Sequence, residues 1–231
     1  MVAPEGVIVI DAQNDSVLAV NEMAAIRTVT DKPVRFLIST HHHGDHTGGN
    51  PVYEKEGVTI ISHRDCRAAM VERQMNGLPI LTFDGAIELY VGGREVDVYH
   101  FGWAHTKGDA VIAIPEAGVV FSGDVLFSGK FQYTGDGNYA GWQNSLDQLK
   151  GLNASEIVPG HGPVSTNKQV DDLAAFFKET MAEVRSMKQA GKSVEDCQKS
   201  IDFKKYFDAG WGGGFFEQLP PLIVEWMYKE N

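Results

Sequence analysis

The sequence lacks the features that mark disulfide-stabilised and membrane-embedded proteins. It contains only two cysteines, Cys66 and Cys197, which lie far apart and outside any CxxC spacing, so we expect two unpaired thiols, with a single disulfide as the alternative. No apolar run approaches the roughly twenty residues that a membrane-spanning helix needs, so we expect no membrane association. No secretory leader is recognisable, which slightly favours the cytoplasm, and a periplasmic location after removal of a leader is the alternative.

Basic residues are also scarce. The chain has 20 Lys and Arg against 31 Asp and Glu, which gives a formal net charge of −11. An acidic surface repels phosphate backbones, so we expect a small-molecule substrate and no nucleic-acid partner. The length of 231 residues favours one domain over residues 1–231, with a C-terminal helical tail over about 193–231. The composition leaves open whether the chain forms a homo-oligomer.

The first half of the chain alternates segments of strand and helix character. Short apolar runs predict strands, and longer runs with polar interruptions predict helices. The strands are expected at Val7–Ile10, Val34–Ser39 and Val58–Ser62, and the helices at 17–29 and 63–75.

The second half begins with strand patterns instead. Residues 80–101 alternate apolar and polar side chains around two glycine turns, which predicts an antiparallel meander, and Ala110–Pro115 with Gly118–Ser122 predicts a hairpin. The elements expected further along are a helix over 142–152, a strand at Glu156–Pro159, an amphipathic helix over 167–190, a capping box from Ser193 to Asp196 and a last helix after Pro221. Two packed sheets with helices outside account for this pattern.

Five potential metal ligands crowd into six consecutive residues directly after the second predicted strand. Side chains at alternate positions of an extended backbone share a side, so His41 and His43 can hold one ion together, whereas His42 points away and is expected to pack or support. Asp45 and His46 follow on the turn into the next helix and can face a second ion. A surface tract or tag remnant is the alternative, but this run is internal and follows a buried strand.

Three more potential ligands follow later apolar runs. His105, Asp124 and His161 each have glycine nearby, which lets the backbone turn sharply and admits close approach to an ion. Imidazole and carboxylate groups suit zinc, and also iron or manganese. Asp11, at the end of the first predicted strand, either supports the histidine-rich segment by hydrogen bonds or caps its own strand.

The order of these residues, HxHxDH followed by a His, an Asp and a His, resembles the metallo-β-lactamase superfamily from Val7 to Pro163. The resemblance implies an α/β fold, namely an αββα sandwich of two mixed sheets flanked by helices, with two zinc ions at one edge. It also implies the ligands, which are His41, His43 and His105 for the first metal, Asp45, His46 and His161 for the second, and Asp124 as a bridge. Related proteins usually place further strands before Val7, so the first sheet either lacks a strand or has an edge that another chain covers.

The function that this resemblance implies is hydrolysis by a dinuclear metal centre. The expected nucleophile is a hydroxide that bridges both metals, and Asp45 would act catalytically by orienting it. The expected substrate is a small carbonyl compound, which is a thioester, an ester, a lactone or, less readily, a lactam. Asp124 disfavours the lactam because the cysteine-bearing lactamases of the family place a thiolate at this point. The histidine-rich segment is similar to the glyoxalase II-like branch, but only Lys204, Lys205 and a few other basic residues are available for glutathione.

Three alternatives to this reading stay open. A phosphodiesterase or nuclease of the same fold is opposed by the net charge, and β-lactamase as the main activity is opposed by Asp124. A mononuclear iron oxygenase, or a metal-binding protein without hydrolytic activity, is opposed by the presence of all seven ligand positions.

Aromatic residues after Asp124 and near the C-terminus either line the substrate pocket or, by default, pack in the core. These residues are Phe131, Tyr133, Tyr139, Trp142, Trp211, Phe215 and Phe216. Trp103 is expected to anchor a loop or to form a wall of the pocket, and His63 and His100 are expected to be structural.

Overall fold

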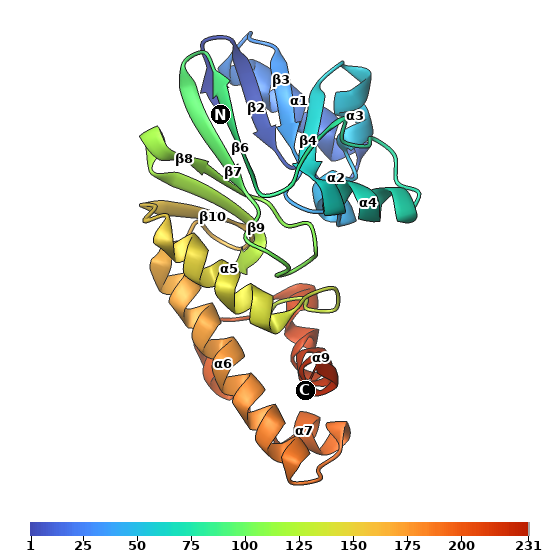
Figure 1. Ribbon diagram of the computed structural model, residues 1–231, viewed down its shortest axis with the longest axis vertical. Helices are drawn as coiled ribbons and strands as arrows, with labels where there is room; N and C mark the ends of the chain where they lie inside the picture. The colour runs from blue at the N-terminus through green and yellow to red at the C-terminus, as the bar shows by residue number, and fades with distance from the viewer. Residues whose placement is uncertain (231) are drawn as a thin grey trace.

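Two mixed five-stranded sheets pack face to face, with helices on both outer sides (Figure 1). The computed structural model describes residues 1–230. The first sheet has the order β1-β2-β3-β4-β5, and the second has the order β10-β9-β8-β7-β6. This arrangement confirms the αββα sandwich that the sequence predicts.

The first sheet is built by strand–helix–strand units. Strands β2 to β5 are mutually parallel, and β1 pairs antiparallel with β2 at the edge. The strands are β1 (Val2–Ala3), β2 (Gly6–Ile10), β3 (Val34–Ile38), β4 (Thr59–His63) and β5 (Leu81–Phe83). The helices of this half are α1 (Ser16–Val29), α2 (Gly44–Thr47), α3 (Asn50–Lys55) and α4 (Arg64–Glu72). The first sheet thus has an additional short edge strand that the sequence pattern did not reveal.

The second sheet is antiparallel except at one edge, where β10 runs parallel to β9. Its strands are β6 (Ala86–Val91), β7 (Arg94–Tyr99), β8 (Val111–Ile114), β9 (Val119–Phe127) and β10 (Glu156–His161). The α-helices of this half are α5 (Tyr139–Gly151), α6 (Asn167–Gln189), α7 (Val194–Ser200), α8 (Lys204–Asp208) and α9 (Pro220–Glu230). Short 3-10 helices lie at η1 (Pro115–Ala117) and η2 (Gly214–Gln218).

Successive side chains of each strand point to opposite faces of the sheet, so the buried hydrophobic residues form three separate layers. Ile8, Ile38 and Ile61 are buried between the two sheets, together with Val98 and Ile112 of the second sheet. Their sequence neighbours pack on the opposite face, where Val7, Leu37 and Ile60 contact the layer of α1 and α3. This period of two is what a strand buried on both faces requires.

The outer face of the second sheet is covered by α5, α6 and the C-terminal helices (Figure 1). Trp142 of α5, Phe176 of α6 and Ile223 of α9 belong to one buried cluster with Val120 and Leu126 of β9. The capping box predicted at Ser193 and Asp196 is present at the start of α7. The residues expected as a C-terminal tail therefore share a hydrophobic cluster with the second sheet.

Three predicted elements need correction. Residues 80–83 do not belong to the antiparallel meander, because Leu81 pairs parallel with Ile61 of β4 and continues the first sheet. The chain returns parallel there because α4 forms a crossover between β4 and β5. Strand β9 extends to Phe127, so Asp124 lies inside the strand and not at its end. Helix α5 begins at Tyr139, three residues before the predicted start, because the Asn138 side chain accepts a hydrogen bond from the Gly141 amide.

Both cysteines are buried and free, as the sequence spacing predicts. Within residues 1–230, no helix combines the length and apolar character needed to cross a membrane.

Candidate metal centre

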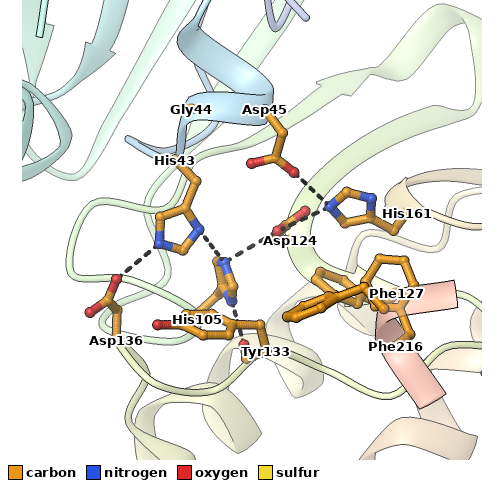
Figure 2. A pocket seen from close by; sticks show the side chains of 11 residues that line it. His43, Gly44, Asp45, His105, Asp124, Phe127, Tyr133, Asp136, His161 and Phe216 are labelled. Atoms are coloured by element: carbon orange, nitrogen blue, oxygen red, sulfur yellow. Dashed lines mark hydrogen bonds and ion pairs between the residues drawn. The ribbon is translucent and has the colours of Figure 1, made fainter. Parts of the chain in front are cut away.

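The seven predicted ligands come from both sheets and meet at one edge of the sandwich. His41 to His46 follow β3 of the first sheet, and α2 begins directly after His43. His105 lies in the loop between β7 and β8, Asp124 lies on β9, and His161 ends β10 of the second sheet. Figure 2 shows five of these side chains, namely His43, Asp45, His105, Asp124 and His161, around one pocket.

The first group of donors consists of His41, His43, His105 and Asp124, which place ligand atoms within 4.8 Å of one another. Nδ1 of His43 lies 2.9 Å from Nε2 of His105. Oδ2 of Asp124 lies 3.2 Å from Nε2 of His105 and 3.5 Å from Nε2 of His41. The geometry therefore brings together the residues that the resemblance assigns to the first metal.

The second group consists of Asp45, His46 and His161, whose ligand atoms also lie within 4.8 Å of one another. Oδ2 of Asp45 is 3.1 Å from Nε2 of His161 and 3.5 Å from Nε2 of His46. Oδ1 of Asp124 lies 3.2 Å from Nε2 of His46, and its Oδ2 lies 3.6 Å from Nε2 of His161. Asp124 thus lies between the two groups, where a bridging ligand would have to be.

Four of the five histidines in the predicted ligand set have one ring nitrogen within hydrogen-bond distance of an acceptor that is not itself a predicted ligand. The pairs are His41 Nδ1 with Thr40 Oγ1 at 3.0 Å, His43 Nε2 with Asp136 Oδ2 at 2.9 Å, His46 Nδ1 with Asp11 Oδ2 at 2.7 Å, and His105 Nδ1 with the Tyr133 carbonyl at 3.0 Å. A carbonyl or carboxylate acceptor requires the N–H on that side, which leaves the other nitrogen to offer its lone pair to a cation bound in the cluster. This is the arrangement of imidazoles that bind a metal.

Asp11 supports the histidine-rich segment, which was one of its two predicted roles. Its Oδ1 accepts a hydrogen bond from the Thr40 amide at 2.7 Å, and its Oδ2 accepts one from the Thr40 hydroxyl at 2.8 Å. The same Oδ2 accepts from His46. Because the Thr40 hydroxyl donates to Asp11, it is free to accept from Nδ1 of His41. One carboxylate thereby fixes the orientation of two predicted ligands.

The burial and charge of the cluster fit divalent cations. Nε2 of His41, Nε2 of His46 and Oδ1 of Asp124 are buried without a hydrogen-bond partner, which is unusual for polar atoms inside a protein. Burial would raise the pKa of Asp124, but His46, His41 and His105 outweigh it and hold this pKa well below its usual range. Burial would lower the pKa of His46, but Asp124 and Asp11 outweigh it and raise it well above the usual value. The carboxylates therefore favour positive charge here, and the imidazole and carboxylate donors suit zinc.

Close approach of β10 to the centre depends on a glycine. A Cβ atom added to Gly160 would lie 1.9 Å from Oδ1 of Asp124, which no real side chain can tolerate. The glycine before His161 therefore lets β10 pass directly against the carboxylate of Asp124.

The pocket in front of the cluster has a volume of about 390 Å³, and phenylalanine and tyrosine side chains form part of its wall. It is lined by His43, Gly44, Asp45, His105, Asp124, Phe127, Tyr133, Asp136, His161, Phe215 and Phe216. Phe216 packs edge-to-face on Phe127 with ring centroids 5.7 Å apart, and it tilts against His161 at 5.2 Å. No Lys or Arg of residues 1–230 lines this pocket.

The C-terminal segment supplies one wall of this pocket and is fastened to the turn after β9. Gly212, Gly213 and Gly214 all have positive φ angles and allow the sharp turn that brings Phe215 and Phe216 to the pocket. Nζ of Lys130 donates a hydrogen bond to the Gly212 carbonyl at 2.6 Å.

The aromatic candidates separate into pocket and core residues. Tyr133, Phe215 and Phe216 line the pocket. Phe131, Tyr139, Trp142 and Trp211 instead pack in the hydrophobic cluster beneath the second sheet. Trp103 anchors a loop, because its Nε1 donates to the Asp136 carbonyl at 2.8 Å, and it lines a neighbouring cavity. Sequence patterns gave no signal for Asp136, which lies in a turn without apolar periodicity.

The remaining histidines lie outside the two donor groups. His63 and His100 stack on each other with ring centroids 3.8 Å apart. His42 is buried and turned away from His41, as the alternation predicts, with its Nε2 3.9 Å from Oδ2 of Asp136. These positions agree with structural roles for all three.

Comparison with known families decides the relationship. The model of the family described as "Metallo-beta-lactamase superfamily" matches residues 1–161. The chain belongs to this superfamily. Its members are hydrolases that bind divalent metals, usually zinc, so the superfamily supports an enzyme with a metal-binding cluster at this site.

Individual relatives are distant. The "Beta-lactamase-like protein 2 homolog" of Caenorhabditis elegans is 25% identical over 83% of this chain and 64% of its own length. A hydroxyacylglutathione hydrolase of Brucella ovis is 30% identical over 66% of this chain and 59% of its own length. The chain thus spans less than two thirds of the length of these relatives. A metallo-beta-lactamase from Pontibacter korlensis has the same fold, with a TM-score of 0.73 and 23% identity over 77% of this chain and 85% of that one.

Proposed function

We propose that this chain is a dinuclear metal-dependent hydrolase of small, neutral carbonyl substrates, with zinc as the first candidate metal and iron or manganese as alternatives. The observation that carries this proposal is the inward orientation of the donors around Asp124. The Nε2 atoms of His41, His46 and His105 lie 3.2–3.5 Å from this one buried carboxylate. Nδ1 of His43 lies 2.9 Å from Nε2 of His105 and belongs to the same donor group.

The residues are assigned roles from their positions. His41, His43 and His105 would hold one cation, Asp45, His46 and His161 the other, and Asp124 would contact both. A pair of divalent cations supplies an activated water nucleophile near neutral pH and polarises the scissile bond. Asp45 lines the pocket, so its carboxylate can accept a hydrogen bond from the attacking water and orient it.

The pocket walls support a substrate with an apolar, uncharged portion. Phe127, Tyr133 and Phe216 would cover that portion and exclude water from the reacting bond. The absence of Lys and Arg from the described lining disfavours substrates that carry phosphate or carboxylate groups beside the scissile bond. The name of the Brucella ovis relative, hydroxyacylglutathione hydrolase, supports a thioester among the candidates. Esters, lactones and lactams offer the same electrophilic carbonyl.

The test is a substrate panel with metal analysis. The purified chain is loaded with zinc, iron or manganese, and the bound metal is counted by elemental mass spectrometry. Each form is then assayed on an acyl thioester, an aryl ester, a lactone, a chromogenic lactam and bis-p-nitrophenyl phosphate. We expect two metals per chain and the highest kcat/KM on a neutral thioester, ester or lactone. Turnover of the phosphodiester alone, or one iron per chain with oxygen uptake, would reject the proposal.

A further inference from the structure

Asp136 makes a direct contact with the predicted metal centre although the predicted ligand set does not include it, and its carboxylate lies within 4.8 Å of ligand atoms of both His42 and His43. Its Oδ2 lies 2.9 Å from Nε2 of His43 (Figure 2). The same oxygen lies 3.3 Å from Nη2 of Arg73 and 3.9 Å from Nε2 of the buried His42. One carboxylate oxygen thus contacts two side chains of the histidine-rich segment and the guanidinium group of Arg73 at the end of α4.

The turn that carries Asp136 is fastened to the loop that carries His105. Nε1 of Trp103 donates to the Asp136 carbonyl at 2.8 Å, and the Asn138 amide donates to the Ala104 carbonyl at 2.9 Å. A Cβ atom at Gly137 would lie 2.9 Å from the Ala104 carbonyl, so the close approach of these two segments needs glycine. The position of Asp136 is therefore set by the same backbone that places His105.

The contact fixes which nitrogen of His43 faces inward. The Asp136 carboxylate only accepts hydrogen bonds when it is ionised, so Nε2 of His43 must carry the proton. Nδ1 then presents its lone pair toward Nε2 of His105, 2.9 Å away. Without the carboxylate, the His43 ring could take the other tautomer or rotate, and both changes would remove its lone pair from the cluster.

We propose that Asp136 is a positioning residue for the donor group of His41, His43 and His105, where it locks His43 with Nδ1 inward and its ring plane fixed. This inference concerns the metal that the proposed function requires. It pairs with Asp11, which holds His46 in the same way at 2.7 Å, so that each half of the cluster has one outside carboxylate. Arg73 contributes less, because its side chain is 44% exposed and exposed ion pairs stabilise weakly.

The decisive variants are Asp136→Ala and Asp136→Asn. Asn keeps the volume and can still accept from His43 through its amide oxygen, whereas Ala removes the acceptor. In competition with a chromophoric chelator, we expect Asp136→Ala to lower the affinity for one of two zinc ions about 10- to 100-fold and to leave the other nearly unchanged. We expect Asp136→Asn to recover most of this loss. Arg73→Gln should change zinc affinity by no more than about threefold. Asp171→Asn, at a surface ion pair with Lys150, is the control for a lost carboxylate.

A second readout needs neither metal nor activity. Long-range ¹H–¹⁵N spectra of the metal-free protein report the tautomer of each imidazole, and we expect His43 as the Nε2–H form in the wild type and a mixture in Asp136→Ala. Unchanged zinc affinity together with an unchanged His43 tautomer in Asp136→Ala would overturn the proposal. If the wild type binds no metal, the proposed function fails, but the tautomer still decides the role of Asp136. Should Asp136→Ala not fold, the same two measurements on Asp136→Leu decide it, because leucine keeps the bulk of the side chain but cannot accept a hydrogen bond from His43.

Discussion

Oδ1 of Asp124 lies 3.2 Å from Nε2 of His46, although the two residues come from different halves of the sandwich. Asp124 is on β9 of the second sheet, and His46 follows β3 of the first. The donor set therefore exists only when the two sheets are packed together. A metal bound there would tie the two halves of the fold to each other.

Removal of metal should therefore lower the free energy of unfolding. A cation that binds only the native donor set stabilises the fold by about 4 kcal/mol when its free concentration is 1,000 times its Kd. We expect the Tm to rise with zinc concentration and to fall after dialysis against a chelator, as measured by circular dichroism. A Tm that does not depend on zinc would mean that the seven donors do not form a metal site in solution.

Replacement of Asp124, the predicted bridging ligand, should strongly reduce turnover without unfolding the protein. Asp124→Asn keeps the shape of the side chain but removes the charge that faces both donor groups. Loss of residues that merely support ligands costs about 10- to 100-fold, so we expect kcat/KM to fall by at least about 100-fold here. Metal content should drop below two ions per chain, and the far-ultraviolet circular dichroism should be retained. Asp171→Asn serves as the surface control, and wild-type kinetics for Asp124→Asn would remove Asp124 from the site.

The predicted ligands could be found from sequence because they are adjacent in the chain or lie in or after apolar runs. His41 and His43 share a side by strand alternation, and glycines three residues from His105 and directly beside His161 indicate sharp turns. Asp11 could also be proposed, since the end of β2 lies beside the end of β3 in a parallel sheet. The layer order of the fold could also be predicted, because the order of strands and helices along the chain indicates two packed sheets with helices outside.

Asp136 and β5 show where sequence reasoning fails. The contact of Asp136 with His43 joins residues 93 positions apart through a turn, and no periodicity indicates it. Leu81 to Phe83 alternates as an antiparallel strand would, but its partner is decided by the crossover through α4 and not by its own pattern. The split of the aromatic residues between pocket and core likewise depends on how α5 and α6 pack. These properties are tertiary, so a local pattern cannot predict them.

The aromatic wall from the C-terminal segment should control substrate binding more than chemistry. Phe216 packs on Phe127 and on the ring of His161 and lines the pocket, but it is not itself a predicted ligand. We expect Phe216→Ala to raise KM for an apolar acyl substrate about tenfold, with kcat within about threefold, because the lost contact is apolar burial. Phe207→Ala, which removes a ring outside this pocket, is the matched control. A loss confined to kcat would show that Phe216 acts on the reacting group instead.

The stacked pair of His63 and His100 should make the fold sensitive to acid independently of the metal centre. Burial, followed by the neighbouring His100, lowers the pKa of His63 to about 4, although Asp65 and Asp84 oppose this shift. Nδ1 of His63 accepts a hydrogen bond from the Asp65 amide and so begins α4 in its neutral form.

The sign of the effect follows from the lowered pKa. In the unfolded chain His63 takes up a proton near pH 6.5, whereas in the folded protein it does so only near pH 4. The contribution of neutral His63 to the free energy of unfolding is therefore complete above pH 6.5. It is lost as the pH falls toward 4, by about 3 kcal/mol in total. His63→Asn keeps a side chain that can cap the start of α4, but asparagine does not take up a proton in this pH range. We expect the free energy of unfolding of the wild type, measured in urea with chelator present, to decline relative to His63→Asn over this range. Parallel curves for the two proteins would show that His63 keeps an ordinary pKa in the folded state.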